Sequence, residues 1–295
     1  MNDQFRELVI RTGVARQKDI GYIFACDPET EMDEPHAKIF RWHQGTFSES
    51  WASFNAHSAC LISVPDPALV FVASDGSYGV HGKKSSAGNI FRASSPAPVE
   101  PRYGDIRWVS EISGKAFACG HTGAVYRLDA LNRWTRIDQG VPTGFNIEAI
   151  HGFDDTDIYA VGNRGEAWRF DGQQWQQIDL PTNLNLTRVK CAADGLVYIA
   201  GHKGLLMRGR DRTWSPIDQQ ATTGDIWGLE WFAGKLYVST MARTYYLRGD
   251  SLEVVEFGDD PPRTHYHLSA ASDVMWSIGE EDIVAFDGRT WTRIV

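Results

Sequence analysis

Long helical patterns and long apolar runs are both missing from this sequence of 295 residues. Apolar side chains do not recur with helical spacing over any sizeable stretch, which argues against long helices. No apolar run approaches the ~20 residues of a membrane-spanning helix. The first residues also lack the basic and apolar regions of a secretory signal. We therefore expect an all-β protein that resides in the cytoplasm and does not contact a membrane.

Cysteine is scarce, and its spacing fits no known framework. The chain has four cysteines, which lie far apart in separate expected strands: Cys26, Cys60, Cys119 and Cys191. Disulfide frameworks and zinc sites are recognised in a sequence by cysteines in closely spaced pairs, and these four cysteines form no such pair. We expect four free, buried thiols, as is usual in a reducing compartment.

Basic residues are outnumbered by acidic ones. The chain has 29 Lys and Arg against 38 Asp and Glu, a formal net charge of −9 at pH 7. Binding to nucleic acid generally needs a basic face, so we do not expect a nucleic-acid partner. An acidic surface would suit a basic protein partner, although it also serves solubility alone.

Catalytic signatures are missing as well. The sequence has no Gly-x-Ser-x-Gly elbow, no Cys/His pair and no paired carboxylates of a glycosidase. His265 and His267 alternate on one expected strand and could supply two metal ligands, but no third ligand is near in sequence. The basic segment 80–88 has glycines but no helix after it, unlike a phosphate-binding loop. We expect no catalytic residues, no metal and no cofactor.

What the sequence does contain is a repeat of about forty residues. Its clearest copies are ACGHTGAVYR at 118–127, AVGNRGEAWR at 160–169 and IAGHKGLLMR at 199–208. Each copy precedes a turn and a tryptophan, and these tryptophans are Trp134, Trp175, Trp214 and, at the chain end, Trp291. A period of this length that consists only of short strands and turns is typical of a β-propeller.

One repeat, residues 146–179, shows how a blade would form. Short apolar runs at 147–151 and 158–161, an aromatic run at 166–170 and a last run at 175–178 alternate with turn-forming residues. The segment 162–165 (Gly-Asn-Arg-Gly) predicts a tight tip, because Asn and Gly tolerate positive φ. Four antiparallel strands of this kind make one blade, and the tryptophan on the fourth would cover the contact between blades.

Divergent copies complete the ring. Strands at 8–11, 20–26, 37–42 and 46–51 predict a first blade, and strands at 59–64, 69–73 and 89–93 predict a second. Decayed copies of the repeat at 226–255 and 265–295 predict the last two blades. The total is a seven-bladed β-propeller of four-stranded antiparallel blades that forms a single domain over residues 1–295. Six blades is the alternative, if the N-terminal segment pairs with another blade.

A six-residue turn, Phe-Asp-Gly-x-x-Trp, occurs at 170–175 and again at 286–291. It resembles the Asp-box of sialidase-like propellers in the turn and its tryptophan, but it lacks the Ser or Thr before the Asp and the spacer after it. The resemblance implies a β-propeller of the bacterial type and implies no activity.

The candidate binding surface is the face where the first strands begin and where the tips between second and third strands lie, which we call the top face. Positions that align at the start of the first strands are polar or aromatic: Arg107, Glu148, Thr187, Trp227 and His267. The tips add Arg164, His202 and Lys203. The residue types differ between blades, which indicates a ligand-specific surface. The alternative is a channel lined with polar groups that hold water.

We interpret the chain as a non-catalytic binding module that is monomeric until a protein partner binds its top face. The most specific form of this hypothesis is an immunity-type protein that neutralises a toxin. The expected binding residues are Arg107, Glu148, Arg164, His202, Lys203, Trp227 and His267. The alternative is a carbohydrate-binding or carbohydrate-active propeller, in which an aromatic ring beside polar groups at the channel mouth takes a small polar ligand.

Overall fold

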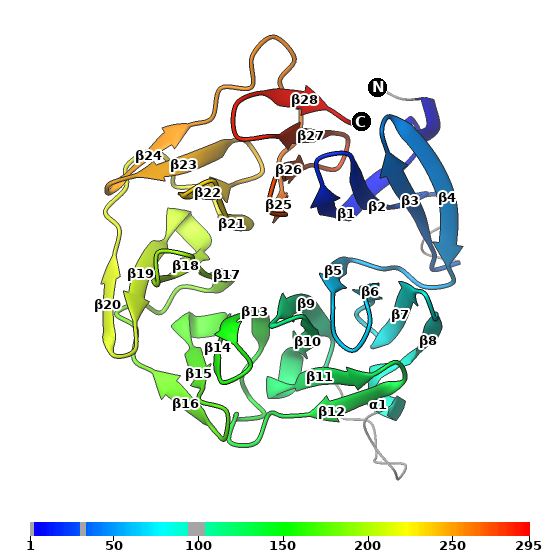
Figure 1. Ribbon diagram of the computed structural model, residues 1–295. Helices are drawn as coiled ribbons and strands as arrows, with labels where there is room; N and C mark the ends of the chain where they lie inside the picture. Colours follow the sequence, from blue (N-terminus) through cyan, green and yellow to red (C-terminus); the bar gives the residue numbers. More distant parts are fainter. Residues whose placement is uncertain (1–2, 30–33, 94–103) are drawn as a thin grey trace.

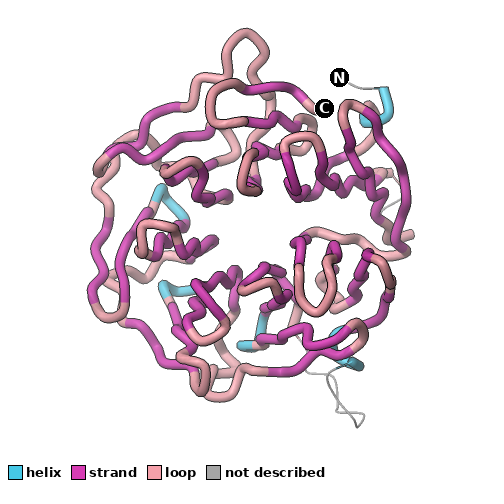
Figure 2. Tube along the Cα trace, viewed as in Figure 1, coloured by secondary structure: helices cyan, strands magenta, loops and turns pink. Residues whose placement is uncertain are grey.

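Seven four-stranded antiparallel sheets surround a central channel in the computed structural model, which describes residues 3–29, 34–93 and 104–295 (Figure 1). Strands provide nearly all of the regular structure, and the helical segments are single turns (Figure 2). In the part of the chain that the structure describes, no helix is long and apolar enough to cross a membrane. The predicted seven-bladed propeller is confirmed, and the six-blade alternative is wrong.

Each blade uses four consecutive strands, ordered from the channel outward. Blades 1 to 4 contain β1 (Val9–Gln17), β2 (Ile20–Cys26), β3 (Ala37–His43), β4 (Thr46–Ala52), β5 (Ser58–Ile62), β6 (Ala68–Val72), β7 (Ser77–Gly82), β8 (Ser86–Asn89), β9 (Ile106–Ile112), β10 (Lys115–Gly120), β11 (Val125–Ala130), β12 (Arg133–Arg136), β13 (Ile147–Asp154), β14 (Asp157–Gly162), β15 (Ala167–Phe170) and β16 (Trp175–Ile178). Blades 5 to 7 contain β17 (Leu186–Cys191), β18 (Val197–Gly201), β19 (Leu206–Arg210), β20 (Thr213–Pro216), β21 (Gly228–Phe232), β22 (Lys235–Ser239), β23 (Thr244–Arg248), β24 (Ser251–Val254), β25 (His267–Ala270), β26 (Met275–Ile278), β27 (Ile283–Phe286) and β28 (Trp291–Arg293). The helical turns are η1 (Asp3–Phe5), α1 (Ile90–Ala93), η2 (His121–Gly123), η3 (Asn163–Gly165) and η4 (His202–Gly204).

Blades pack face to face because a single four-stranded sheet cannot bury its own two apolar faces. The second strands carry most of this packing, and β14 and β18 are buried along their whole length. Ala118, Ala160 and Ala200 are fully buried on these second strands. Their small side chains let neighbouring sheets approach closely, as the repeat pattern predicts.

The repeated tryptophans close the outer edge of the contact between blades. Trp134 and Trp175 are buried, and Trp175 donates a hydrogen bond from Nε1 to the carbonyl of Ile137 in the preceding blade at 2.8 Å. Trp214 and Trp291 occupy the same place in their blades but are only half-buried. The structural role predicted for these residues therefore holds fully for the first two and in part for the others.

Blade 2 differs from its prediction. The segment 89–93 was expected to be a strand, but Ile90–Ala93 forms the single turn α1. The third strand is β7, in which Tyr78 and Val80 are buried, and the fourth is β8. Position 79 requires glycine, because a Cβ there would lie 2.2 Å from the ring of Phe71. Glycine is not typical of strands, so the strand is not recognised in the sequence. The basic segment 80–88 belongs to the hairpin of β7 and β8.

No blade of the ring combines strands from the two ends of the chain. The first and last blades are each built from one continuous segment, and the chain ends lie next to each other (Figure 1). The indole of Trp276 packs on Gly21 across this seam, where a Cβ would lie 2.0 Å from the ring. The amide of Ile10 donates to the carbonyl of Glu280 at 2.9 Å. Packing of Trp276 and this backbone hydrogen bond, rather than a blade shared between the two ends of the chain, therefore hold blades 1 and 7 together.

All four cysteines are free and buried in the structure. Burial raises the pKa of the Cys60, Cys119 and Cys191 thiols far above their ordinary value. Because the thiolate is the reactive form, these side chains act as small apolar core residues. The prediction of free thiols is confirmed.

Candidate binding site at the mouth of the central channel

The first strands of all seven blades begin around one cavity on the top face. This cavity, the mouth pocket, has a volume of about 270 Å³. Every blade contributes a polar or aromatic side chain to its wall: Arg11, His57, Arg107, Glu148, Arg188, Trp227 and His267, in the order of the blades. Chain segments that lie far apart in the sequence therefore meet at one point, which is the place where propellers offer a composite site.

The structure brings four of the seven predicted binding residues together. Arg107, Glu148, Trp227 and His267 all line the mouth pocket. His202 stands beside it, with its ring centroid 5.7 Å from that of Trp227. The predicted convergence at the starts of the first strands is therefore present for these residues.

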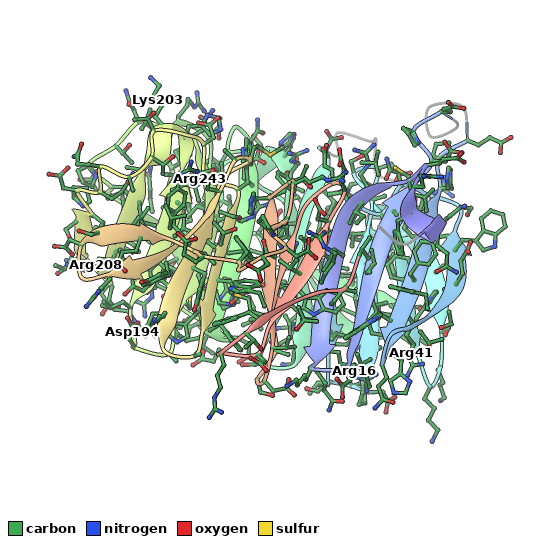
Figure 3. The ribbon with its side chains drawn as sticks, turned by 90° about the horizontal axis from the view of Figure 1, so that it is seen from above. Arg16, Arg41, Asp194, Lys203, Arg208 and Arg243 are labelled. Carbon is green, nitrogen blue, oxygen red and sulfur yellow. The ribbon has the colours of Figure 1, made fainter. Side chains whose placement is uncertain are left out.

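The other two predicted residues lie on the tips, outside the pocket. Arg164 in η3 and Lys203 in η4 are exposed. Seen from the side, Lys203 stands on one face of the disc, and Arg16 and Asp194 stand on the opposite face (Figure 3). The top face thus presents a recessed pocket and, separately, raised basic tips.

The tips are held in a fixed conformation. Arg164 and Lys203 have a φ of 55°, a left-handed conformation that non-glycine residues rarely adopt. The backbone amide of Arg164 donates to the side chain of Asn185, and that of Lys203 donates to Asp225, each at 2.9 Å. Because each acceptor lies in the segment that leads to the next blade, these two tips are tied to the blades that follow them.

The prediction missed two residues at the centre of the channel, Trp108 and Arg188. A β-bulge near the top of β1, β9, β13 and β17 places two residues of the first strand opposite one residue of the second. A bulge breaks the alternation of side chains, so the sequence period of two no longer tells which residue points inward. In β17 the expected lining residue Thr187 is buried and donates its hydroxyl to the carbonyl of Ile226 at 2.5 Å. Arg188 lines the pocket in its place.

Arg11 and His57 were also missed, because blades 1 and 2 diverge too far from the repeat for their residues to be aligned with it. The sequence contained one indication of the two central residues. Trp108 and Arg188 each directly follow an aligned position of the repeat, Arg107 and Thr187.

An ion-pair cluster forms one wall of the mouth pocket. Glu148 accepts from Nε of Arg107 at 3.1 Å through one carboxylate oxygen. Its other oxygen lies 3.3 Å from Nε2 of His121. Both oxygens are thus engaged within the chain, which holds the two neighbouring side chains in place.

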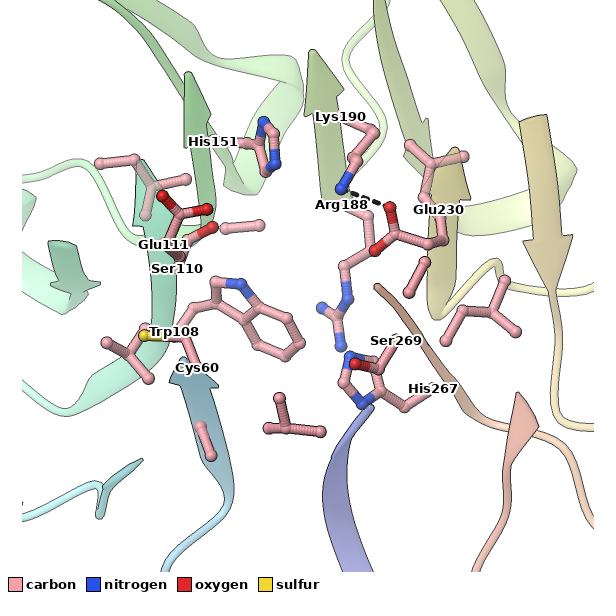
Figure 4. Close-up of a pocket in the computed structure, with 18 of the residues that line it drawn as sticks. Cys60, Trp108, Ser110, Glu111, His151, Arg188, Lys190, Glu230, His267 and Ser269 are labelled. Carbon is pink, nitrogen blue, oxygen red and sulfur yellow. Dashed lines mark ion pairs between the residues drawn. The ribbon is translucent and has the colours of Figure 1, made fainter. Parts of the chain in front are cut away.

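Three side chains form the floor of the mouth pocket and divide the channel (Figure 4). The guanidinium of Arg188 stacks on the indole of Trp108, with its carbon 4.1 Å from the ring centroid. The ring of His267 meets the same indole edge-on at 5.2 Å, and its Nδ1 lies 3.4 Å from the hydroxyl of Thr12. All three also border a second cavity of about 180 Å³ on the other side. These three side chains therefore lie between the two cavities of the channel.

The second cavity carries its own polar groups. Lys190 and Glu230 form an ion pair there, and His151 accepts a hydrogen bond from the backbone amide of Cys191 at 3.2 Å (Figure 4). Burial lowers the pKa of His151 well below its ordinary value, and the positive charge of Lys190 adds to this effect. In the described part of the chain, no group of three or more His, Cys, Asp or Glu side chains is arranged to hold a metal ion.

His267 makes stability depend on pH. Burial, with the charges of Arg188 and Lys190 as smaller causes, lowers the pKa of His267 to about 3, against about 6.5 in the unfolded chain. Between these values only the unfolded state binds the proton, so acidification favours unfolding. We expect the free energy of unfolding to fall by about 2–3 kcal/mol between pH 6.5 and 4.5 on account of this residue.

Urea unfolding at several pH values measures this dependence, with His267→Gln as the comparison. The variant should show a shallower fall over the same range, since the buried carboxylates and His151 remain unchanged. Parallel curves for the two proteins would contradict a neutral, buried His267.

Fold and site together define a seven-bladed β-propeller whose recessed, polar mouth pocket collects side chains from all blades. Solved structures share this fold at low sequence identity. Virginiamycin B lyase from Staphylococcus aureus superimposes with a TM-score of 0.74 at 11% identity, covering 97% of this chain and 96% of that one. YCF48 bound to D1 peptide superimposes with a TM-score of 0.67 at 14% identity, covering 95% and 91%. These likenesses concern the fold alone.

A sequence relative is much closer. The immune protein Tsi7 of Pseudomonas aeruginosa is 39% identical over 297 residues, covering 96% of this chain and 96% of the relative. No family model matches the sequence. On this identity over nearly the full length, the chain belongs to the family of the immune protein Tsi7.

Proposed function

We propose that this protein is an immunity protein that neutralises a toxin by binding it, without catalysis, through the top face. The observation that carries the proposal is the 39% identity to an immune protein over 96% of both chains. On this proposal the protein is a monomer in the cytoplasm before it meets its partner, where its four thiols stay reduced.

The construction of the top face supports a protein partner. A side chain in a left-handed conformation is less favourable than glycine, and such strain tends to persist where the side chain has a role. Arg164 and Lys203 carry long basic side chains there on tips that the next blade holds rigid. A surface that is already ordered loses little entropy on association, which favours tight binding.

Charge and composition of the surface indicate the kind of partner. The net charge of −9 favours encounter with a basic protein through long-range attraction. Trp227 stands at the pocket edge between the rings of His202 and Tyr266, with centroid distances of 5.7 and 6.0 Å. Large aromatic residues in such partly desolvated positions often dominate the binding energy of an interface.

A carbohydrate ligand is the second candidate function, and one observation favours it. The mouth pocket places the rings of Trp227 and Tyr266 beside the polar groups of Arg107 and Glu148. Such a combination suits a small polar ligand that stacks on an aromatic ring. A glycan array with the purified protein distinguishes the two functions, because a toxin-binding protein should bind no glycan there.

Replacing Trp227 by alanine is expected to weaken binding of the toxin by about 2 kcal/mol, or roughly thirtyfold. The ring is half-buried at the pocket edge and is not part of the buried apolar core between blades, so the melting temperature should hardly change. The toxin is first isolated as the polypeptide that copurifies with the protein from its native cell, and affinity is then measured by calorimetry.

Trp51→Ala is the matched control, since Trp51 is 73% exposed on the outer strand β4, away from the mouth pocket. Its affinity for the toxin should equal that of the unaltered protein. If Trp227→Ala also binds with full affinity, and a change at the turns of the opposite face weakens binding instead, the partner sits on the opposite face.

A further inference from the structure

The guanidinium of Arg188 is an anomaly at the centre of the channel. The residue is only 9% exposed, and among the described residues its Nε has no hydrogen-bond partner. Its NH1 donates to the carbonyl of Thr187 at 2.7 Å, its guanidinium stacks on the face of Trp108, and it forms a hydrogen bond with the side chain of Tyr266. In the described part of the chain no acidic side chain forms an ion pair with it. A buried cation without a counter-ion is costly, because lost hydration is not replaced.

The carboxylates that share its surroundings are already engaged. Glu148, in the mouth pocket, is held by Arg107 and His121 through its two oxygens. Glu230, on the other side of the floor, pairs with Lys190. Glu148 therefore acts on Arg188 through its charge but forms no direct ion pair with it, and the Nε of Arg188 stays unmatched among the described residues.

Guanidinium groups gather at the mouth pocket. Three guanidinium groups line it, from Arg11, Arg107 and Arg188, against the two carboxylates of Glu148 and Glu280. Burial lowers the pKa of His57 as well as that of His267, so both rings are neutral near pH 7. Arg188 is the buried guanidinium of the pocket, and its Nε is unmatched among the described residues.

We propose that the mouth pocket is a carboxylate-binding site, in which Arg188 pairs with an acidic side chain that the protein partner inserts from the top face. The source of the carboxylate rests on the proposed function, whereas the site itself rests on the structure alone. The pocket volume of about 270 Å³ accommodates one side chain rather than a segment of chain. The planar guanidinium, fixed by stacking on Trp108, offers its Nε to a carboxylate oxygen.

The site is tested first on the isolated protein. The probe is acetyl-glutamate methylamide, and its uncharged counterpart acetyl-glutamine methylamide is the control. Nitrogen-15 spectra report the Nε–H signal of Arg188, assigned by its loss in Arg188→Met. We expect a saturable shift of this signal with the glutamate probe and none with the glutamine probe. Absence of a shift at tens of millimolar probe, or equal shifts with both probes, overturns the site.

The source of the carboxylate is tested on the complex with the copurified toxin. Arg188→Met should lower the affinity about thirtyfold or more, since it leaves an acidic side chain of the partner buried and unmatched. Arg188→Lys keeps the charge but not the planar donor group and should recover only part of the loss. Arg41→Gln, on the opposite face, is the control and should bind normally (Figure 3). Full affinity in Arg188→Met overturns the partner as source, even if the probe binds.

A structural role for Arg188 predicts a different result. In that case Arg188→Met would lower the melting temperature of the isolated protein, whereas removal of an uncompensated buried cation should leave it unchanged or raise it. A lowered melting temperature with unchanged affinity overturns the inference. If the proposed function fails, the set of results is different. The probe still shifts the Arg188 signal, but no polypeptide copurifies with the protein, so there is no complex in which Trp227→Ala could weaken binding.

Discussion

Replacement of Trp276 by alanine is expected to lower the free energy of unfolding by about 3–5 kcal/mol. The indole is fully buried, lies edge-on to Trp42 at 5.9 Å and covers the backbone at Gly21. It therefore joins blade 7 to blade 1, the one junction in the ring that the continuous chain does not bridge. Loss of the ring leaves a cavity at this seam, and both chain ends lose packing together. Urea unfolding followed by fluorescence measures the change.

Trp214→Ala serves as the comparison, because Trp214 is half-buried on an outer strand within the ring. We expect a loss of only about 1–2 kcal/mol there. Hydrogen exchange should separate the two variants further: amides of β1 and β25 should exchange faster in Trp276→Ala alone. If both variants lose the same stability and show the same exchange rates, the junction of blades 1 and 7 contributes no more to stability than the other contacts between blades.

Replacement of Gly165 by alanine is expected to cost about 2–4 kcal/mol. Gly165 has a φ of 72° and ends the tip of blade 4, where a Cβ would lie 2.2 Å from the carbonyl oxygen of Thr182. The methyl group must push the tip away from the segment that leads to blade 5. The same displacement moves Arg164, so affinity for the toxin should fall as well. Thermal and urea unfolding, together with calorimetry, measure both effects.

Gly195→Ala isolates the steric part of this effect. Gly195 has a similar φ of 84°, but a Cβ there meets no atom within 4 Å. We expect a cost of about 1–2 kcal/mol from the backbone conformation alone, with unchanged binding. If both alanine variants lose the same stability, the close approach between tip and neighbouring blade contributes nothing.

The repeat in the sequence predicted the architecture because each blade is a local structure. Its strands and turns depend on residues within about forty positions, so glycines such as Gly162 and Gly165 and aromatics such as Trp175 leave a periodic pattern. The same locality predicted which face carries the variable tips and why four distant cysteines stay apart. Blade 2 was assigned in part wrongly because Gly79 and its neighbours do not show the usual signal of a strand.

The candidate site could be predicted only in outline. Arg107, Glu148, Trp227 and His267 were found because aligned positions of a repeat meet at one end of the channel. Whether these residues and the tips Arg164, His202 and Lys203 bind a partner stays a prediction. Arg11 and His57 were missed because the first two blades have lost the pattern that would align them.

The sequence by itself determined the number of blades, the strands of the blades other than blade 2 and the end of the channel at which the aligned first-strand positions meet, since these follow from the repeat itself. Only the tertiary structure decided how the ring closes at Trp276 and Gly21, and that Arg188 and Trp108 rather than Thr187 occupy the channel centre. The physical reason is that both features depend on contacts between distant blades and on β-bulges. A bulge shifts a strand by one residue without changing its hydrophobic pattern enough to be recognised.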